Sequence, residues 1–309
     1  MAVGGYVFTY PDVARRESLL DVMNMLEPTD TQLLSGIKQS QAANTLHEWT
    51  IDTLESVGDN AQGEGADAPS DASNDPTRPQ NVTQIFAKTA KISGSETADA
   101  LNRVGGNRMS RELMKKMKAL KNDIEYALVR GSIASGVAST SSASARRLKG
   151  VKNWITTNTS NYSGATLTET ITNDIFEAVW QQGSQVDAVY SPMKGKRRIS
   201  GFTAGATKQV DINDRRLVLA VDVYQADAAK MVKLFPHRHV TVSGDYGTTS
   251  TPGFDVLALT EDTWATAWYR KPFTKQLAET GDFTAKELIT ELTLEARQEK
   301  ANAMGRVFF

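Results

Sequence analysis

The chain has 309 residues, of which 40% are hydrophobic and 23% are charged, so it can bury a substantial core in one large domain or two smaller ones. Its 35 basic and 36 acidic residues give a formal net charge of -1, which argues against a general nucleic-acid coat, because such proteins usually carry a basic excess. The absence of cysteine excludes disulfides and thiolate metal sites, and without a signal-peptide pattern or a membrane-length apolar run we expect an unexported protein that contacts no membrane.

Residues 1–45 are expected to form an arm rather than the start of a compact domain. A short amphipathic helix is predicted over 13–26 and ends before Pro28, and a second apolar patch spans 33–37. Neither patch has an adjacent core to pack on in the sequence, so both would need an outside partner. An arm folded back on its own domain is the alternative.

Residues 46–94 predict a projecting hairpin. Strands are expected over 46–54 and 82–92, and a stretch rich in Gly, Asp, Asn, Ser and Pro lies between them. A structureless loop of this length is usually functional or disordered, and an isolated hairpin is only marginally stable. We therefore expect it to gain order on another chain, with an inconsequential acidic loop as the alternative. Its candidate contact residues are Glu55, Asp59, Glu64, Asp67, Asp71 and the single base Arg78.

The clearest helix is expected over about 109–130. Apolar side chains recur there every three or four residues, at Leu113, Met117, Leu120, Ile124 and Leu128. Charged side chains fall on the other faces, at Arg111, Lys115, Lys118 and Glu125. Their basic excess could face nucleic acid, but a solvated face is the more usual outcome. The small-residue stretch 132–145 then indicates a flexible connection.

The pattern becomes mixed α/β from about residue 165. A helix is expected around 171–180, and a second one begins at Ser191-Pro192, with the serine as its cap. Apolar runs predict strands over 186–190, 217–224, 231–235, 255–260 and 264–270. Apolar and polar residues then alternate over 287–296, which favours a strand despite the helix-prone Leu and Glu.

No motif in the sequence predicts catalysis. A P-loop, a nucleophile elbow and a zinc-protease motif are all absent. His237 and His239 could share one strand face, but no carboxylate pattern completes a metal site around them, so we expect no catalytic residue, no metal and no cofactor. The strongest basic patch could contact phosphate, but it is more typical of a solvated helix face or of a partner for neighbouring acidic loops. It consists of Lys194, Lys196, Arg197 and Arg198.

Several stretches, in this order, resemble a family of phage major head proteins with the HK97-like fold. They are HEWTIDTL, EGADAP, QNVTQIFAKTAKISGS, LKNDIEYALVRGS, ARRLKGVKNWITTN, AVWQQG leading to KRRISGF, and YRKPFTKQLAETGDFTAKELITELTLEARQEKA. No single stretch is specific, but together they cover nearly everything from Leu46 onward. The resemblance implies an α+β fold with an N-terminal arm (1–45), an extended loop (46–94), a peripheral domain built on a spine helix at about 109–130 (95–164 and 263–309), and an α/β axial domain (165–262).

The same resemblance implies a structural, non-enzymatic function. Copies of such a chain would assemble as hexamers and pentamers into an icosahedral head that encloses double-stranded DNA. The implied partners are further copies of the chain, a portal protein, a decoration or cement protein, and packaged DNA on the inner face. Because the arm is too short to contain a scaffolding region, a separate scaffolding protein is expected. Assembly would take place in the host bacterial cytoplasm, and the product would be the virion.

The chain departs from the family at one chemical feature. The best-known member cross-links its shell through a lysine in the extended loop, whereas residues 51–87 here contain no lysine, and Lys88 and Lys91 come only near the hairpin base. We therefore expect a non-covalent shell. Three other functions remain open: the shell of a cellular protein nanocompartment with the same fold, a nucleic-acid-binding protein, and an enzyme with an unrecognised site.

Overall fold

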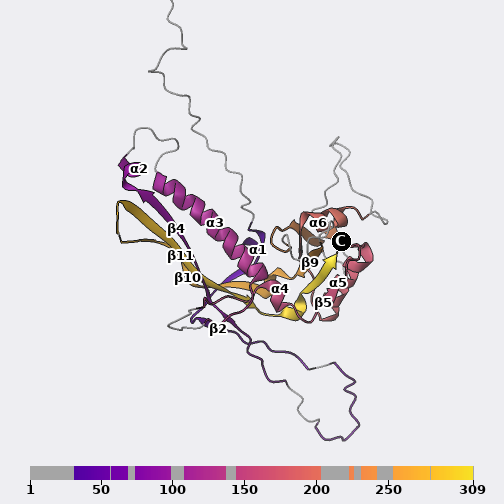
Figure 1. The fold of residues 1–309 in the computed structure, drawn as a ribbon. Helices are drawn as coiled ribbons and strands as arrows, with labels where there is room; N and C mark the ends of the chain where they lie inside the picture. The colour runs from indigo at the N-terminus through magenta and orange to yellow at the C-terminus, as the bar shows by residue number, and fades with distance from the viewer. Residues whose placement is uncertain are drawn as a thin grey trace, which may run out of the picture.

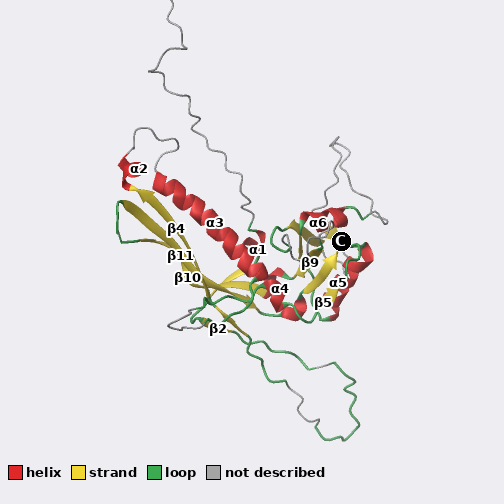
Figure 2. Cartoon of the chain, in the orientation of Figure 1, coloured by secondary structure: helices red, strands yellow, loops and turns green. Residues whose placement is uncertain are grey.

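The computed structural model describes residues 31–55, 57–68, 74–98, 108–136, 144–202, 223–225, 231–241, 253–278 and 280–308. The helix expected over 13–26 and most of the strand expected over 217–224 lie outside these residues. Two regions are visible in Figures 1 and 2: a long sheet with one long helix along it, and a second sheet with two shorter helices.

The long sheet has four strands in the order β1-β10-β11-β4. Strand β11 is antiparallel to both of its neighbours, and β1 runs parallel to β10. The register of β10 shifts on either side of Arg270, next to Pro272, which lies beyond the last residue paired with β1. Proline is tolerated there because that part of β10 needs no ladder donor toward β1. The bounds are β1 Lys38–Gln41, β4 Gln84–Ser93, β10 Trp264–Gln276 and β11 Phe283–Ala296.

Helix α3 (Arg108–Arg130) lies along the β4 and β11 side of this sheet, and the short helix α2 (Gly94–Ala98) follows β4 (Figure 1). The helix expected over 109–130 is therefore confirmed. Its apolar stripe is buried only in the second half, at Leu120, Ile124 and Leu128, whereas Met117 is 45% exposed. The strand expected over 287–296 is also confirmed and begins four residues earlier, as β11.

The second sheet has six strands in the order β5-β12-β9-β6-β8-β7. Helices α5 (Glu169–Gln181) and α6 (Met193–Ser200) pack on it, and the expected helix around 171–180 is confirmed. Gly183, with a φ of 81°, adopts the left-handed conformation just after α5 and ends it. The remaining bounds are α4 Val151–Trp154, β5 Thr159–Asn161, β6 Ala188–Ser191, β7 Val223–Gln225, β8 Met231–Pro236, β9 Phe254–Leu259, β12 Ala303–Phe308, and the 3-10 turns η1 Glu261–Thr263 and η2 Glu299–Ala301.

Strands β6 and β9 divide their side chains between two hydrophobic cores. Val189 and Val256 point to the core that contains the buried faces of α5 and α6. Tyr190 and Leu257 point the other way, into the core formed with α3, Trp264 and β11. Successive side chains of a strand alternate between faces, so a register slip of one residue would exchange both sets. One face of β6 and β9 therefore packs on α5 and α6, and the opposite face packs on the first region.

The cap expected for α6 is wrong. Pro192 occupies the N-cap position, and the Ser191 hydroxyl donates to the Pro192 carbonyl instead of accepting from the helix. The reason is that Ser191 is the last residue of β6 and is buried there. Gly195 keeps α6 close to the sheet, because a Cβ at that position would lie 2.9 Å from Ser191 Cβ and 3.0 Å from the Phe254 ring.

The apolar patch at 33–37 packs on its own chain, which corrects the expectation that it lacks a core. It forms α1 (Gln32–Gly36), and Leu33 and Ile37 are buried against the core that contains α3. Glu125 of α3 was expected on a polar face but is fully buried. Its two oxygens accept the backbone N–H groups of Leu33 (2.7 Å) and Leu34 (2.9 Å), which a helix start would otherwise leave unpaired. The arm thus folds back in this part.

Glu125 also reaches the end of β8 through a histidine. His237 Nε2 lies 2.8 Å from Glu125 Oε1, and both side chains are buried. The backbone N–H of His239 donates to His237 Nδ1 (3.1 Å). Because Nδ1 accepts this bond, the ring hydrogen is on Nε2 and points at the carboxylate. One carboxylate therefore joins α1, α3 and the second sheet.

Leu128→Ala should lower the free energy of unfolding of the unassembled subunit by about 2–5 kcal/mol, because it leaves a cavity beneath α3. Leu128 is 0% exposed, whereas Met114 on the same helix is 63% exposed. The matched change Met114→Ala should cost less than about 0.5 kcal/mol. Urea unfolding followed by circular dichroism measures both, and equal effects would contradict the described orientation of α3.

Candidate functional site

The most exposed described segment is the loop of residues 52–79, which leaves the body beside β2 and extends away from both sheets (Figure 1). Its base is a short antiparallel pair, β2 (Leu46–Glu48) with β3 (Gln80–Val82), continued by a bridge between Ile51 and Thr77. The hairpin expected here is confirmed at its base, but its strands differ. The first is shorter than 46–54, and most of the second is β4, whose partner is β11. Figure 2 shows that the rest of the described loop contains no helix or strand.

The acidic candidates in this loop are solvent-exposed. Glu55, Asp59, Glu64 and Asp67 have exposed side chains, and Asp71 lies outside the described residues. Arg78 lies 3.8 Å from Glu48, and because both are well exposed this contact adds little stability. Two apolar side chains of the loop, Leu54 and Val57, are also almost fully exposed.

The base of the loop, in contrast, is fixed by buried polar groups, and Asn81 makes the most contacts. Its amide group donates to the carbonyls of Leu294 (2.7 Å) and Lys149 (3.1 Å). Its side-chain oxygen accepts the N–H groups of Lys149 (2.9 Å) and Val82 (2.9 Å). Asn81 is 0% exposed, and its bonds with Leu294 and Val82 are buried, so they are shielded from water. The second limb of the loop, which leads into β3, is therefore held to β11.

The first limb of the loop follows β2, and Trp49 and His47 hold it to the same end of β11. Trp49 Nε1 donates to the Ala296 carbonyl (2.8 Å), and its ring lies 5.6 Å from that of Trp154. His47 Nε2 lies 3.5 Å from Glu295 Oε2. Both limbs are thus anchored within three residues of each other on β11, between 294 and 296.

Glu295 accepts two hydrogen bonds at this position, in addition to its contact with His47. Ser40 Oγ donates to Oε2 (2.7 Å), and Arg297 Nε donates to Oε1 (2.9 Å). The contact with His47, together with the Ser40 and Arg297 bonds, lowers the pKa of Glu295 to about 2, against the opposing effect of desolvation. The carboxylate is therefore ionised at neutral pH and links β1, β2 and β11.

Glu291, four residues earlier on the same strand, forms a second buried cluster. Its Oε1 accepts from Thr83 Oγ1 (2.7 Å) and from Arg146 (2.7 Å), and its Oε2 accepts from Arg270 Nε (2.8 Å). The side chain is only 2% exposed. Removing one partner of such a group is costly because a buried charge is left uncompensated. The alternation over 287–296 predicted the strand that carries Glu291 and Glu295 but gave no signal of their partners.

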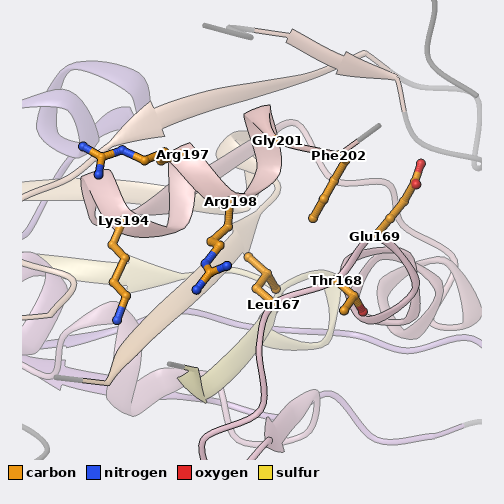
Figure 3. A pocket seen from close by; sticks show the side chains of 8 residues that line it. All are labelled: Leu167, Thr168, Glu169, Lys194, Arg197, Arg198, Gly201 and Phe202. Carbon is orange, nitrogen blue, oxygen red and sulfur yellow. The ribbon is translucent and has the colours of Figure 1, made fainter. Parts of the chain in front are cut away.

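The basic candidates lie elsewhere, on α6. Lys194, Arg197 and Arg198 line a hollow of about 620 Å³ next to Thr168 and Glu169 at the start of α5 (Figure 3). In Figure 3 the Arg197 side chain points away from that of Arg198. Lys196 is on the same helix but does not line the hollow. Within one chain α6 and the acidic loop are well separated, so the structure does not bring the two sets of candidates together (Figure 1).

The described residues include no group of three or more His, Asp or Glu side chains placed to hold a metal ion. His237 is occupied by Glu125, as above. In the same described part of the chain, no helix is both long and apolar enough to cross a membrane.

Two comparisons with known sequences both match major capsid proteins. Residues 3–307 match the family described as SU10 major capsid protein. A stretch of 131 residues is 30% identical to the major capsid protein of Escherichia phage Phieco32, over 42% of this chain and 37% of that protein. The chain thus matches well under two thirds of that relative's length.

Solved structures share the fold at low identity. The capsid of Myoviridae phage XM1 is 11% identical with a TM-score of 0.59, over 99% of this chain and 100% of that one. The SrpI encapsulin of Synechococcus elongatus PCC 7942, in a holo complex, is 9% identical with a TM-score of 0.57, over 92% of each chain.

Glu295→Gln should destabilise the unassembled subunit at pH 7 and much less at pH 3. The pKa of Glu295 is depressed, so its contribution is present above the ordinary value of 4.5 and is lost as the pH falls toward 2. The expected difference in unfolding free energy at pH 7 is about 1–3 kcal/mol. Denaturant unfolding at several pH values measures it. Glu287→Gln, a partly exposed position on the same strand, is the control; a pH-independent effect of Glu295→Gln would contradict the prediction.

Proposed function

The chain belongs to the SU10 major capsid protein family, with the HK97-like capsid fold, and is a structural subunit of a phage head; we propose that its copies form the hexamers and pentamers of an icosahedral shell around double-stranded DNA. The carrying observation is the loop of residues 52–79, which is exposed along its described length but held at its base by Asn81, Trp49 and their partners. A fixed base directs such a loop outward. The loop then loses conformational entropy only when it becomes ordered against a neighbouring copy.

The regional roles are part of the proposal. Residues 46–94 supply the extended loop, 95–164 and 263–309 the peripheral domain with α3 as its spine, and 165–262 the axial domain at capsomer centres. Residues 1–45 act as the arm, although α1 and β1 from this region already pack on α3 and β10. Each copy then offers different surfaces to its two neighbours, and a repeated contact of that kind closes into a ring.

The proposed partners follow from the same role. They are a portal protein, a separate scaffolding protein, a decoration or cement protein, and DNA on the inner face, with assembly in the bacterial cytoplasm. We assign no catalytic activity, because the family is structural and the buried carboxylates described above are occupied by structural partners. The likeness to an encapsulin supports the fold alone, and the family match favours a phage head over a nanocompartment.

Removing the loop should abolish shells without unfolding the subunit. In the variant to make, residues 58–74 are replaced by a short Gly-Ser linker, which keeps the Ile51–Thr77 bridge and the Asn81 contacts. The wild type, expressed with and without its neighbouring phage genes, should give closed shells, tubes or capsomer rings in negative-stain electron microscopy. The variant should give none but keep the wild-type circular dichroism. A wild type that stays monomeric or dimeric under all conditions would contradict the proposed function. Normal shells from the variant would show that the loop is not needed for assembly.

Assembled shells should dissociate completely to monomer in boiling detergent. The described loop residues include no lysine, and the lysines after it are engaged within the chain: Lys88 pairs with Asp123 of α3 (2.6 Å), and Lys91 lies over the Phe283 ring (3.9 Å). A denaturing gel of purified shells tests this. Bands at multiples of 33.7 kDa would show that a covalent bond forms between copies.

A further inference from the structure

The hollow between α5 and α6 has the size and the charge of a site for a small anion. Its volume of about 620 Å³ lies within the range of small-molecule sites, roughly 300–1,000 Å³. Three of its eight lining residues are cationic, Lys194, Arg197 and Arg198, and Glu169 is the single acid among them. The lining therefore has an excess of positive charge, although the whole chain is close to neutral.

Arg198 is the cation best placed to hold a ligand. In Figure 3 its guanidinium lies beside Leu167, on the same side of α6 as the Lys194 ammonium. Arg198 is exposed and forms no ion pair with any described residue. All five of its N–H donors therefore stay available, in a planar arrangement that matches two oxygens of one phosphate group.

The Glu169 carboxylate does not neutralise this arginine. In Figure 3 it points away from the Arg198 guanidinium, and its Oε1 accepts a hydrogen bond from the hydroxyl of Tyr224 on β7 (3.4 Å). The start of α5 adds to the positive side, because the backbone N–H groups of Glu169 and Thr170 have no acceptor among the described residues. Such groups favour a negative charge nearby.

The rest of the lining is apolar. Leu167 is only 2% exposed, and Phe202 is partly buried on the side of the hollow near Tyr224, with a distance of 6.4 Å between the two ring centroids. An aromatic ring in this position offers a surface on which a planar group can pack. The hollow thus combines cations at one end with apolar side chains beside them.

We propose that this hollow binds a small phosphorylated anion of nucleotide size, such as a nucleoside triphosphate. Its phosphates contact Arg198 and Lys194, and its base packs on Leu167 and Phe202. Because all lining residues belong to one chain, the binding goes beyond the shell function and does not require it. A ligand held in this way joins α5 to α6 and stabilises the second sheet region by mass action.

Two other ligands fit the hollow less well. Duplex DNA presents its phosphates on a convex surface, so it favours raised cations such as Arg197, which points away from Arg198 in Figure 3. An acidic segment of another copy would supply carboxylates to the arginine but no planar group for Phe202. Both are outcomes of the test below.

Isothermal titration calorimetry of the purified full-length protein tests the site, with ATP, inorganic triphosphate and adenosine as probes in magnesium-free buffer. ATP should bind once per chain, inorganic triphosphate more weakly, and adenosine not at all. Arg198→Gln should weaken the binding of both phosphate compounds about tenfold, because a charge-assisted hydrogen bond is lost. Lys196→Gln is the matched control, since Lys196 is a cation of the same helix outside the hollow, and it should change the affinity little.

A second variant separates the two ends of the ligand. Phe202→Ala should weaken the binding of ATP several-fold and leave that of inorganic triphosphate unchanged, with the wild-type circular dichroism retained. Equal weakening of both compounds would contradict the placement of the base.

Three results would overturn the proposal. They are a wild type that does not bind ATP, equal losses from Arg198→Gln and Lys196→Gln, which would indicate diffuse attraction to charge, and displacement of ATP by lower concentrations of a short DNA duplex or of a peptide of residues 59–71. Because the titration needs no shell, a protein that binds ATP but never assembles would contradict only the proposed function.

Discussion

One buried carboxylate constrains how the parts of this subunit are arranged. Glu125 accepts two backbone N–H groups of α1 and faces the Nε2 hydrogen of His237. A carboxylate buried without such donors would be costly, so burial of this part of α3 depends on contacts from both α1 and the residue after β8. The arm segment, the long helix and the second sheet are therefore positioned by a shared requirement, and the hydrophobic core around α3 extends through all three.

Strand β11 has the corresponding role for the loop. Within a few residues it provides the carbonyl that holds Asn81 and the two carboxylates, Glu291 and Glu295, that join the loop base to β1, β10 and the chain around Arg146. Polar groups that are fully paired in this way specify one geometry, whereas the described loop beyond Ile51 makes few contacts with the body. The subunit thus places a fixed base directly beside an adaptable tip.

Periodicity predicted much of the fold. The 3.6-residue repeat located α3, the two-residue repeat located β11, and the ordered similarities along the chain gave the HK97-like fold. What the sequence did not reveal are the polar contacts, because the partners are distant: Glu125 and Leu33 are 92 residues apart, and Asn81 and Leu294 are 213 apart. A charged residue on a helical wheel is taken as solvated unless its partners are known, which is why Glu125 was misplaced. The exposed acids of the loop and the α6 cluster were located as residues, and their contacts with a neighbour stay predictions.

The separation between loop base and loop tip also has an evolutionary consequence. Since neither hydrophobic core includes any described residue of the tip, changes in its length or sequence leave the subunit's own folding nearly untouched. Selection on the tip therefore acts through the match to a neighbouring copy, and a change there can be answered by a change on the receiving surface. Subunits of one lineage can in this way lose the ability to co-assemble with those of another while their folds remain superimposable.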